Sequence, residues 1–90
     1  SGKALMGSGI HYFPNPVRNG FTVQVRYKET GVMKINLYSL DGRLIKQKQL
    51  MKQEELVSTA VDIRELVKGV YMLEVLIGDQ LRETMKLVKQ

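Results

Sequence analysis

Apolar and polar residues alternate along most of this 90-residue chain, in short runs that glycines separate. A period of two places successive side chains on opposite faces of a β-strand. Turn signals at a spacing of about ten residues are typical of an all-β sandwich. The glycines between the runs are Gly20, Gly31, Gly42, Gly69 and Gly78. We therefore expect an immunoglobulin-like β-sandwich of about seven antiparallel strands.

A first strand is expected from Ile10, and six further strands follow from the alternating runs. These runs cover 21–27, 32–40, 43–49, 56–63, 70–77 and 81–88. In the sixth strand the pattern turns Tyr71 and Leu73 inward and Glu74 outward, while Glu83 of the last strand falls on the inner face near the rim. Residues 1–9, with three glycines and two serines, are expected to be a linker or tail, and 10–90 the folded domain.

One segment is ambiguous, because 43–56 is rich in the helix formers Leu, Lys, Gln and Glu. Asp41-Gly42 immediately before it is a strong hairpin signal, since both central residues of a type I′ turn need positive φ. That signal favours a strand reaching about Gln49, followed by a polar loop through Glu55.

Composition excludes several functional classes. The chain has no cysteine and one histidine, His11, so disulfides, thiolate metal sites and histidine-based catalytic sets are not expected. Paired carboxylates, nucleophile–base sets and phosphate loops are also missing from the pattern. The net charge of +5 is spread over strands and turns, and with no tryptophan there are few platforms for stacking bases. We expect no enzyme, no cofactor, no bound metal, no nucleic-acid partner and no direct membrane insertion.

Two local motifs carry structural predictions. The spacing from Leu66 through Gly69 to Tyr71 is that of a tyrosine corner, in which the hydroxyl bonds to backbone a few residues upstream. Pro14 and Pro16 remove two amide donors, so their segment cannot lie in the middle of a sheet. It is expected to end an edge strand, or to act as a stiff joint.

Taken in order, the motifs resemble the type A C-terminal sorting domain of the type IX secretion system of Bacteroidetes. The resemblance covers about 10–90 and depends on the order and spacing of the motifs. They are Tyr12-Phe13-Pro14-Asn15-Pro16, Leu37-Tyr38-Ser39-Leu40-Asp41-Gly42-Arg43-Leu44, Val61-Asp62-Ile63, Leu66-Val67-Lys68-Gly69-Val70-Tyr71 and Lys86-Leu87-Val88-Lys89-Gln90.

The resemblance implies a non-catalytic secretion signal attached to an upstream cargo. The cargo would pass through the periplasm and then reach the cell surface or the medium. The implied partners are an outer-membrane translocon with its shuttle protein, and a sortase-like peptidase that usually removes the domain and attaches the cargo to a surface lipopolysaccharide. Cleavage would then fall in or before residues 3–9. The implied sorting-signal residues are Pro14, Pro16, Asp41, Gly42, Arg43, Gly69, Tyr71, Lys86, Leu87, Val88 and Lys89.

Two alternatives remain open from the sequence. An immunoglobulin-like adhesion or carbohydrate-binding module would need exposed aromatic side chains, for which Tyr12, Phe13 and Tyr38 are the candidates. A structural spacer without a partner is the other alternative.

Overall fold

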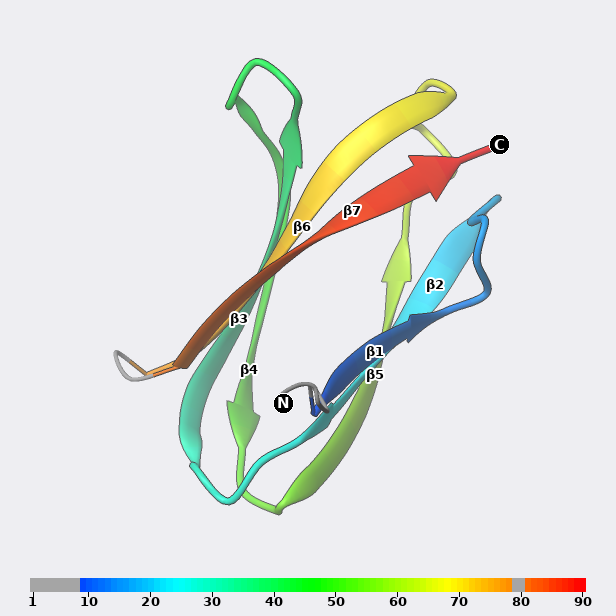
Figure 1. Cartoon of the computed structure of the whole chain (residues 1–90). Coiled ribbons are helices and arrows are strands. Elements are labelled where there is room, and N and C mark those ends of the chain that lie inside the picture. Colours follow the sequence, from blue (N-terminus) through cyan, green and yellow to red (C-terminus); the bar gives the residue numbers. More distant parts are fainter. Residues whose placement is uncertain (1–8, 79–80) are drawn as a thin grey trace.

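The computed structural model describes residues 9–78 and 81–90, which form seven strands in two antiparallel sheets. The strands are β1 (Ile10–Phe13), β2 (Gly20–Arg26), β3 (Gly31–Ser39), β4 (Leu44–Lys52), β5 (Leu56–Asp62), β6 (Gly69–Ile77) and β7 (Leu81–Lys89). One sheet has the order β1-β2-β5 and the other the order β4-β3-β6-β7. The expected β-sandwich of seven strands is confirmed (Figure 1).

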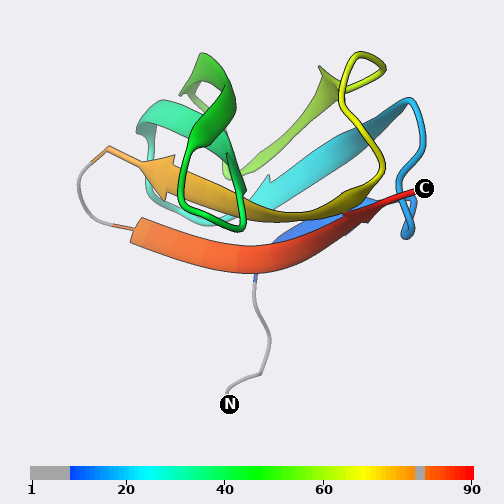
Figure 2. The ribbon, with the colours of Figure 1, turned by 90° about the horizontal axis from the view of Figure 1, so that it is seen from above.

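The core fills the space between the two sheets. Alternate residues of the central strands are buried there, as the period of two predicts. The fully buried side chains include Val23, Val25, Met33, Leu73 and Val75. Seen from above, the two sheets form two layers (Figure 2).

The hairpin between β3 and β4 differs from the expected type I′ turn. Its only positive φ is at Gly42, at +88°, and the Gly42 N–H donates to the Ser39 carbonyl at 3.0 Å. A tight turn followed by one glycine in the left-handed region is the usual three-residue hairpin loop. The Ser39 hydroxyl donates to the Asp41 carboxylate, so the Asp41 side chain is hydrogen-bonded within the hairpin. The φ of Asp41 itself is not positive. The prediction of positive φ at Asp41 was therefore wrong.

Strand β4 is longer than expected, because it continues three residues past Gln49 to Lys52. The ladder with β3 runs to the pair Gly31–Lys52, so only a short loop is left before β5. Lys52 is fully buried, and its ammonium donates to the carbonyls of Tyr27, Glu29 and Glu54. This one side chain ties the loop after β2 to the loop after β4.

Lysines of β4 also cover the edge of the opposite sheet. Among the described strands, β5 has a hydrogen-bonded neighbour, β2, on one side only. On its other side, Lys48 donates to the carbonyl of Ala60 at 2.5 Å and Lys46 donates to the carbonyl of Asp62. Exposed carbonyls of an edge strand invite pairing with another chain, so these lysines protect β5 from that pairing.

Candidate functional site

The proline segment and the end of β7 are joined by backbone hydrogen bonds. Val17, which follows Pro16, donates its N–H to the Val88 carbonyl at 2.9 Å. Its own carbonyl accepts the Gln90 N–H at 2.7 Å. The side chain of Val17 is fully buried. The loop after β1 therefore occupies the outer edge of β7 as a short parallel bridge.

A side chain of β1 reaches the same edge. The hydroxyl of Tyr12 donates to the Lys86 carbonyl at 2.7 Å, and the Tyr12 ring packs edge-on against Phe21, with centroids 6.0 Å apart. Burial raises the pKa of the Tyr12 hydroxyl, because it disfavours the charged form. Tyr12 and Val17 together link the two sheets along β7.

The predicted tyrosine corner is confirmed. The Tyr71 hydroxyl donates to the Val67 carbonyl at 2.6 Å, four residues upstream. Gly69, with φ of +150°, turns the chain into β6 at this corner. The register pairs Gly69 with Lys89 and Tyr71 with Leu87, so the corner lies directly against the end of β7.

Three loops and the end of β7 carry the predicted motifs, and all four lie at one end of the sandwich. Loop 14–19 follows β1, loop 40–43 joins β3 to β4, and loop 63–68 joins β5 to β6. Because Ser39 pairs with Tyr71 and Gly69 with Lys89, the hairpin, the corner and the end of β7 share that end. We call it the motif end (Figure 1). Gly9 lies at the opposite end, where its carbonyl accepts the Arg26 N–H at 2.7 Å.

The expected signal residues differ in how closely they approach the last strand. Gly69 and Tyr71 pair with the last strand, and the segment of Pro14 and Pro16 reaches that strand through Val17. The hairpin residues Asp41, Gly42 and Arg43 are exposed, and Gly42 lines a groove together with Met72 of β6.

Within the terminal motif, the side chains divide into structural and exposed ones. Leu87 is fully buried in the core, and Val88 is half-buried. Lys89 is only 9% exposed, and its ammonium donates to the Leu66 carbonyl at 2.5 Å. Lys86 is the exposed one of the four. A partner that contacts this motif in the folded domain can therefore reach the Lys86 side chain most easily.

Three contacts of this end were not predicted from the sequence: Val17 with Val88, Tyr12 with Lys86, and Lys89 with Leu66. Each joins segments that are distant in the chain. For the contact of Val17 with Val88, the sequence does indicate the donor, because Val17 is the first residue after the two prolines and has an amide N–H. It does not indicate that Val88 is the acceptor.

Both halves of the sandwich carry more cations than carboxylates, as the spread of charge along the sequence suggests. Among the described residues, the cations of the motif end are Arg18, Arg43, Lys46, Arg64, Lys68, Lys86 and Lys89, and its carboxylates are Asp41, Asp62, Glu65 and Glu74. The opposite half carries Arg26, Lys28, Lys34, Lys48, Lys52 and Arg82 against Glu29, Glu54, Glu55 and Glu83. The motif end therefore keeps a net positive charge.

The carboxylates of this end have ion-pair or hydrogen-bond partners. Arg64 pairs with Asp62 at 2.8 Å, and Lys46 pairs with Glu65 at 3.0 Å. Hydrogen bonds from these cations hold the pKa of each carboxyl below its ordinary value. The Ser39 hydroxyl lowers the pKa of Asp41 in the same way.

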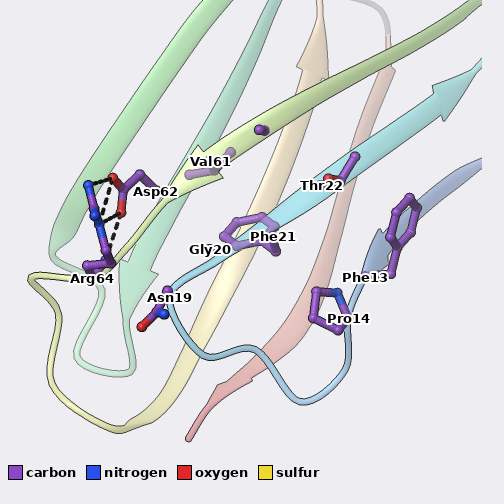
Figure 3. Close-up of a pocket in the computed structure, with 10 residues that line it drawn as sticks. Phe13, Pro14, Asn19, Gly20, Phe21, Thr22, Val61, Asp62 and Arg64 are labelled. Atoms are coloured by element: carbon purple, nitrogen blue, oxygen red, sulfur yellow. Dashed lines mark hydrogen bonds and ion pairs between the residues drawn. The ribbon is translucent and has the colours of Figure 1, made fainter.

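A shallow depression of about 570 Å³ lies on the outside of the three-stranded sheet at this end. Phe13 and Pro14 form one side of it, and the Asp62–Arg64 pair forms the other (Figure 3). Because these two charges satisfy each other, the depression offers a ligand little beyond the exposed Phe13 ring.

The aromatic side chains that a carbohydrate site would need are not gathered. Tyr12 lies between the sheets, Phe13 outside the three-stranded sheet, and Tyr38 outside the four-stranded one. Tyr38 also donates its hydroxyl to Glu74 at 3.1 Å. The arrangement gives the carbohydrate-binding alternative no support.

Among the described residues, no three His, Cys, Asp or Glu side chains are grouped as metal ligands. The described part of the chain also lacks any helix with the length and apolarity needed to span a membrane.

Comparison with known proteins identifies the family. The model of the secretion system C-terminal sorting domain matches residues 11–90, nearly the whole chain. Searches among curated proteins and among solved structures found no match. The matched range contains all the segments that meet at the motif end. The chain therefore belongs to the secretion system C-terminal sorting domains, and it carries a sorting signal for type IX secretion.

Proposed function

We propose that this domain directs an upstream cargo from the periplasm across the outer membrane, with the folded motif end as the surface that the translocon and its shuttle protein contact. The observation that carries the proposal is the pair of hydrogen bonds that Val17 makes with Val88 of β7 and with Gln90, the residue after β7. They connect the proline motif to the terminal motif. A receptor reading this end would contact a composite surface that exists only in the folded domain.

The position of the cargo supports the same assignment. The chain enters the fold at Gly9, which bonds to Arg26 and Tyr27 at the end opposite the motifs. A cargo attached there leaves the motif end open to a receptor. A sortase-like peptidase cutting before Gly9 would release the cargo, for transfer to a surface lipopolysaccharide, without opening the sandwich.

The role of the domain in this scheme is recognition without catalysis. The exposed Lys86, the hairpin and the corner offer binding contacts. The carboxylates of Asp41, Asp62 and Glu65 are held in ion pairs and hydrogen bonds. Chemistry on the cargo would be supplied by the peptidase.

The proposal is tested with a reporter that carries a signal peptide and ends in this chain. It is expressed in a host with the type IX system and in the same host lacking the translocon. We expect the reporter at the surface or in the medium of the first host and in the periplasm of the second. The exported reporter should lack the domain, with its new C-terminus in or before residues 3–9. The same distribution in both hosts would contradict the proposal.

A further inference from the structure

Several apolar side chains lie on the outside of the four-stranded sheet at the motif end. The register places Tyr38 between Leu44 on β4 and Met72 on β6. Leu40 of the hairpin is 68% exposed, and Leu44 is 47% exposed. Large apolar side chains gathered on one exposed face of a small domain are typical of a contact surface.

A groove of about 380 Å³ crosses this face. Leu40, Tyr38 and Met72 contribute apolar walls, and Glu74 lies at its polar side. The Glu74 carboxylate accepts the Asn36 amide at 3.0 Å and the Tyr38 hydroxyl at 3.1 Å. The Glu74 carboxylate is thus held within the sheet, and Ser39 and Thr84 also line the polar side of the groove. The apolar side, formed by Leu40, Tyr38 and Met72, lies next to the hairpin.

Cations flank this groove on two sides. Lys86 on β7 is paired with Met72 in the register and is exposed. Arg43 follows Gly42, which lines the groove, and is also exposed. Asp41 lies beside Arg43 and offsets part of its charge. No carboxylate among the described residues forms an ion pair with Lys86. Apolar walls with cations on the rim fit a ligand of the complementary kind.

We propose that this groove binds an acidic segment of the outer-membrane secretion machinery, which inserts an apolar side chain between Leu40 and Met72 and places carboxylates near Lys86 and Arg43. This inference rests on the proposed sorting function and names the contact surface within it. The basic excess of the whole motif end favours such a partner over a second copy of this chain, because two copies would repel each other at this end.

The proposal gives different roles to the two lysines of the terminal motif. Lys86 meets the partner, whereas Lys89 holds the corner through the Leu66 carbonyl. Replacing Lys86 should therefore reduce export without lowering the melting temperature. Replacing Lys89 should lower the melting temperature, and any loss of export should follow from it.

The test compares two double charge reversals in the reporter fusion. Lys86→Glu with Arg43→Glu changes the groove rim. Lys28→Glu with Lys34→Glu is the matched control, because these lysines are also exposed and lie in the other half of the sandwich. Melting temperatures of both purified proteins verify that they fold. In parallel, a photo-crosslinking residue replaces Leu40, or Met51 as the exposed apolar control.

We expect the groove variant to lose at least tenfold in exported reporter while the control retains wild-type export. Crosslinks from position 40 should join an outer-membrane secretion component, should be weak from position 51, and should disappear in the groove variant. Export of the groove variant at wild-type level, with wild-type reporter exported normally, would overturn this inference and leave the sorting function intact. Failure of the wild-type reporter itself would instead refute the sorting function. A dimer in sedimentation that the groove variant dissociates would assign the groove to a second copy and would also overturn the inference.

Discussion

The N–H of Val17 donates to the carbonyl of Val88 at 2.9 Å, and this contact joins residues that are 71 positions apart in the sequence. It makes the proline segment the neighbour of the last strand, although the two belong to different parts of the sequence. The terminal motif is consequently a built part of the sandwich, held by Val17 on one side and by β6 on the other.

Removing the Tyr71 hydroxyl tests the corner. Tyr71→Phe loses the bond to Val67 but keeps the ring in the core, so we expect the free energy of unfolding to fall by about 1 kcal/mol. In a domain of this size that corresponds to a melting temperature lower by roughly 4–8 °C. Urea denaturation with an unchanged midpoint would show that the hydroxyl contributes nothing.

The buried ammonium of Lys52 should be the more important of two lysines on the same strand face. Lys52→Met leaves three carbonyls without their donor, and we expect a loss of about 2–3 kcal/mol. Lys48→Met, the matched control, removes one bond to Ala60 and should cost about 1 kcal/mol or less. Equal midpoints for the two variants in urea would contradict the role given to Lys52.

Substitutions of the hairpin glycine, Gly42, should change stability through their backbone conformation and not through the size of the new side chain. A Cβ at Gly42 would meet no atom within 4 Å, but its φ of +88° is unfavourable for alanine. Gly42→Ala should therefore cost about 1 kcal/mol. Gly42→Asn should recover part of this loss, because asparagine tolerates the left-handed region better. The ranking is measured by thermal unfolding, and alanine as stable as glycine would refute it.

Acid should weaken the domain through the paired carboxyls. The pKa values of Asp41, Asp62 and Glu65 are lowered in the fold, Asp62 chiefly by Arg64 and Glu65 chiefly by Lys46. Their stabilisation is complete above the unfolded pKa range of about 4 and is lost as the pH falls through the lower folded values. These groups are exposed, so the effect should be small and should shrink in salt.

Melting temperatures between pH 7 and pH 2.5 measure this effect. We expect little change from pH 7 to pH 5 and a fall below about pH 4. Asp62→Asn with Glu65→Gln should reduce the fall, and this variant separates the ion pairs from the general repulsion of a positively charged protein in acid. A fall of the same size in the variant would contradict the assignment.

Much of the fold followed from the sequence, because strand identity depends on local alternation. The strands, the inward residues of β6 and the bond from Tyr71 to an upstream carbonyl were all predicted in this way. The predicted hairpin type was wrong, because Ser39 supplies a hydrogen-bond partner for Asp41 that the dipeptide Asp-Gly does not reveal.

The meeting of the motifs could not be predicted, because it depends on sheet order. Nothing near Val17 indicates that its N–H will face Val88, and nothing near Lys89 indicates Leu66. The extension of β4 to Lys52 was missed for a similar reason. A lysine next to Gln53 and Glu54 suggests an exposed loop, and only the folded chain brings three carbonyls to its ammonium.

The central claim is that the motif end of this domain carries the export signal, and export of truncated and intact reporters tests it most directly. One reporter ends with the whole chain, and the other ends at Met85 and so lacks Lys86 to Gln90. Lys89→Met in the intact chain, which loses the bond to Leu66, controls for destabilisation. We predict surface or medium location for the intact reporter and periplasmic retention for the truncated one, with Lys89→Met exported in proportion to its folded fraction. Equal export of the intact and truncated reporters would contradict the claim.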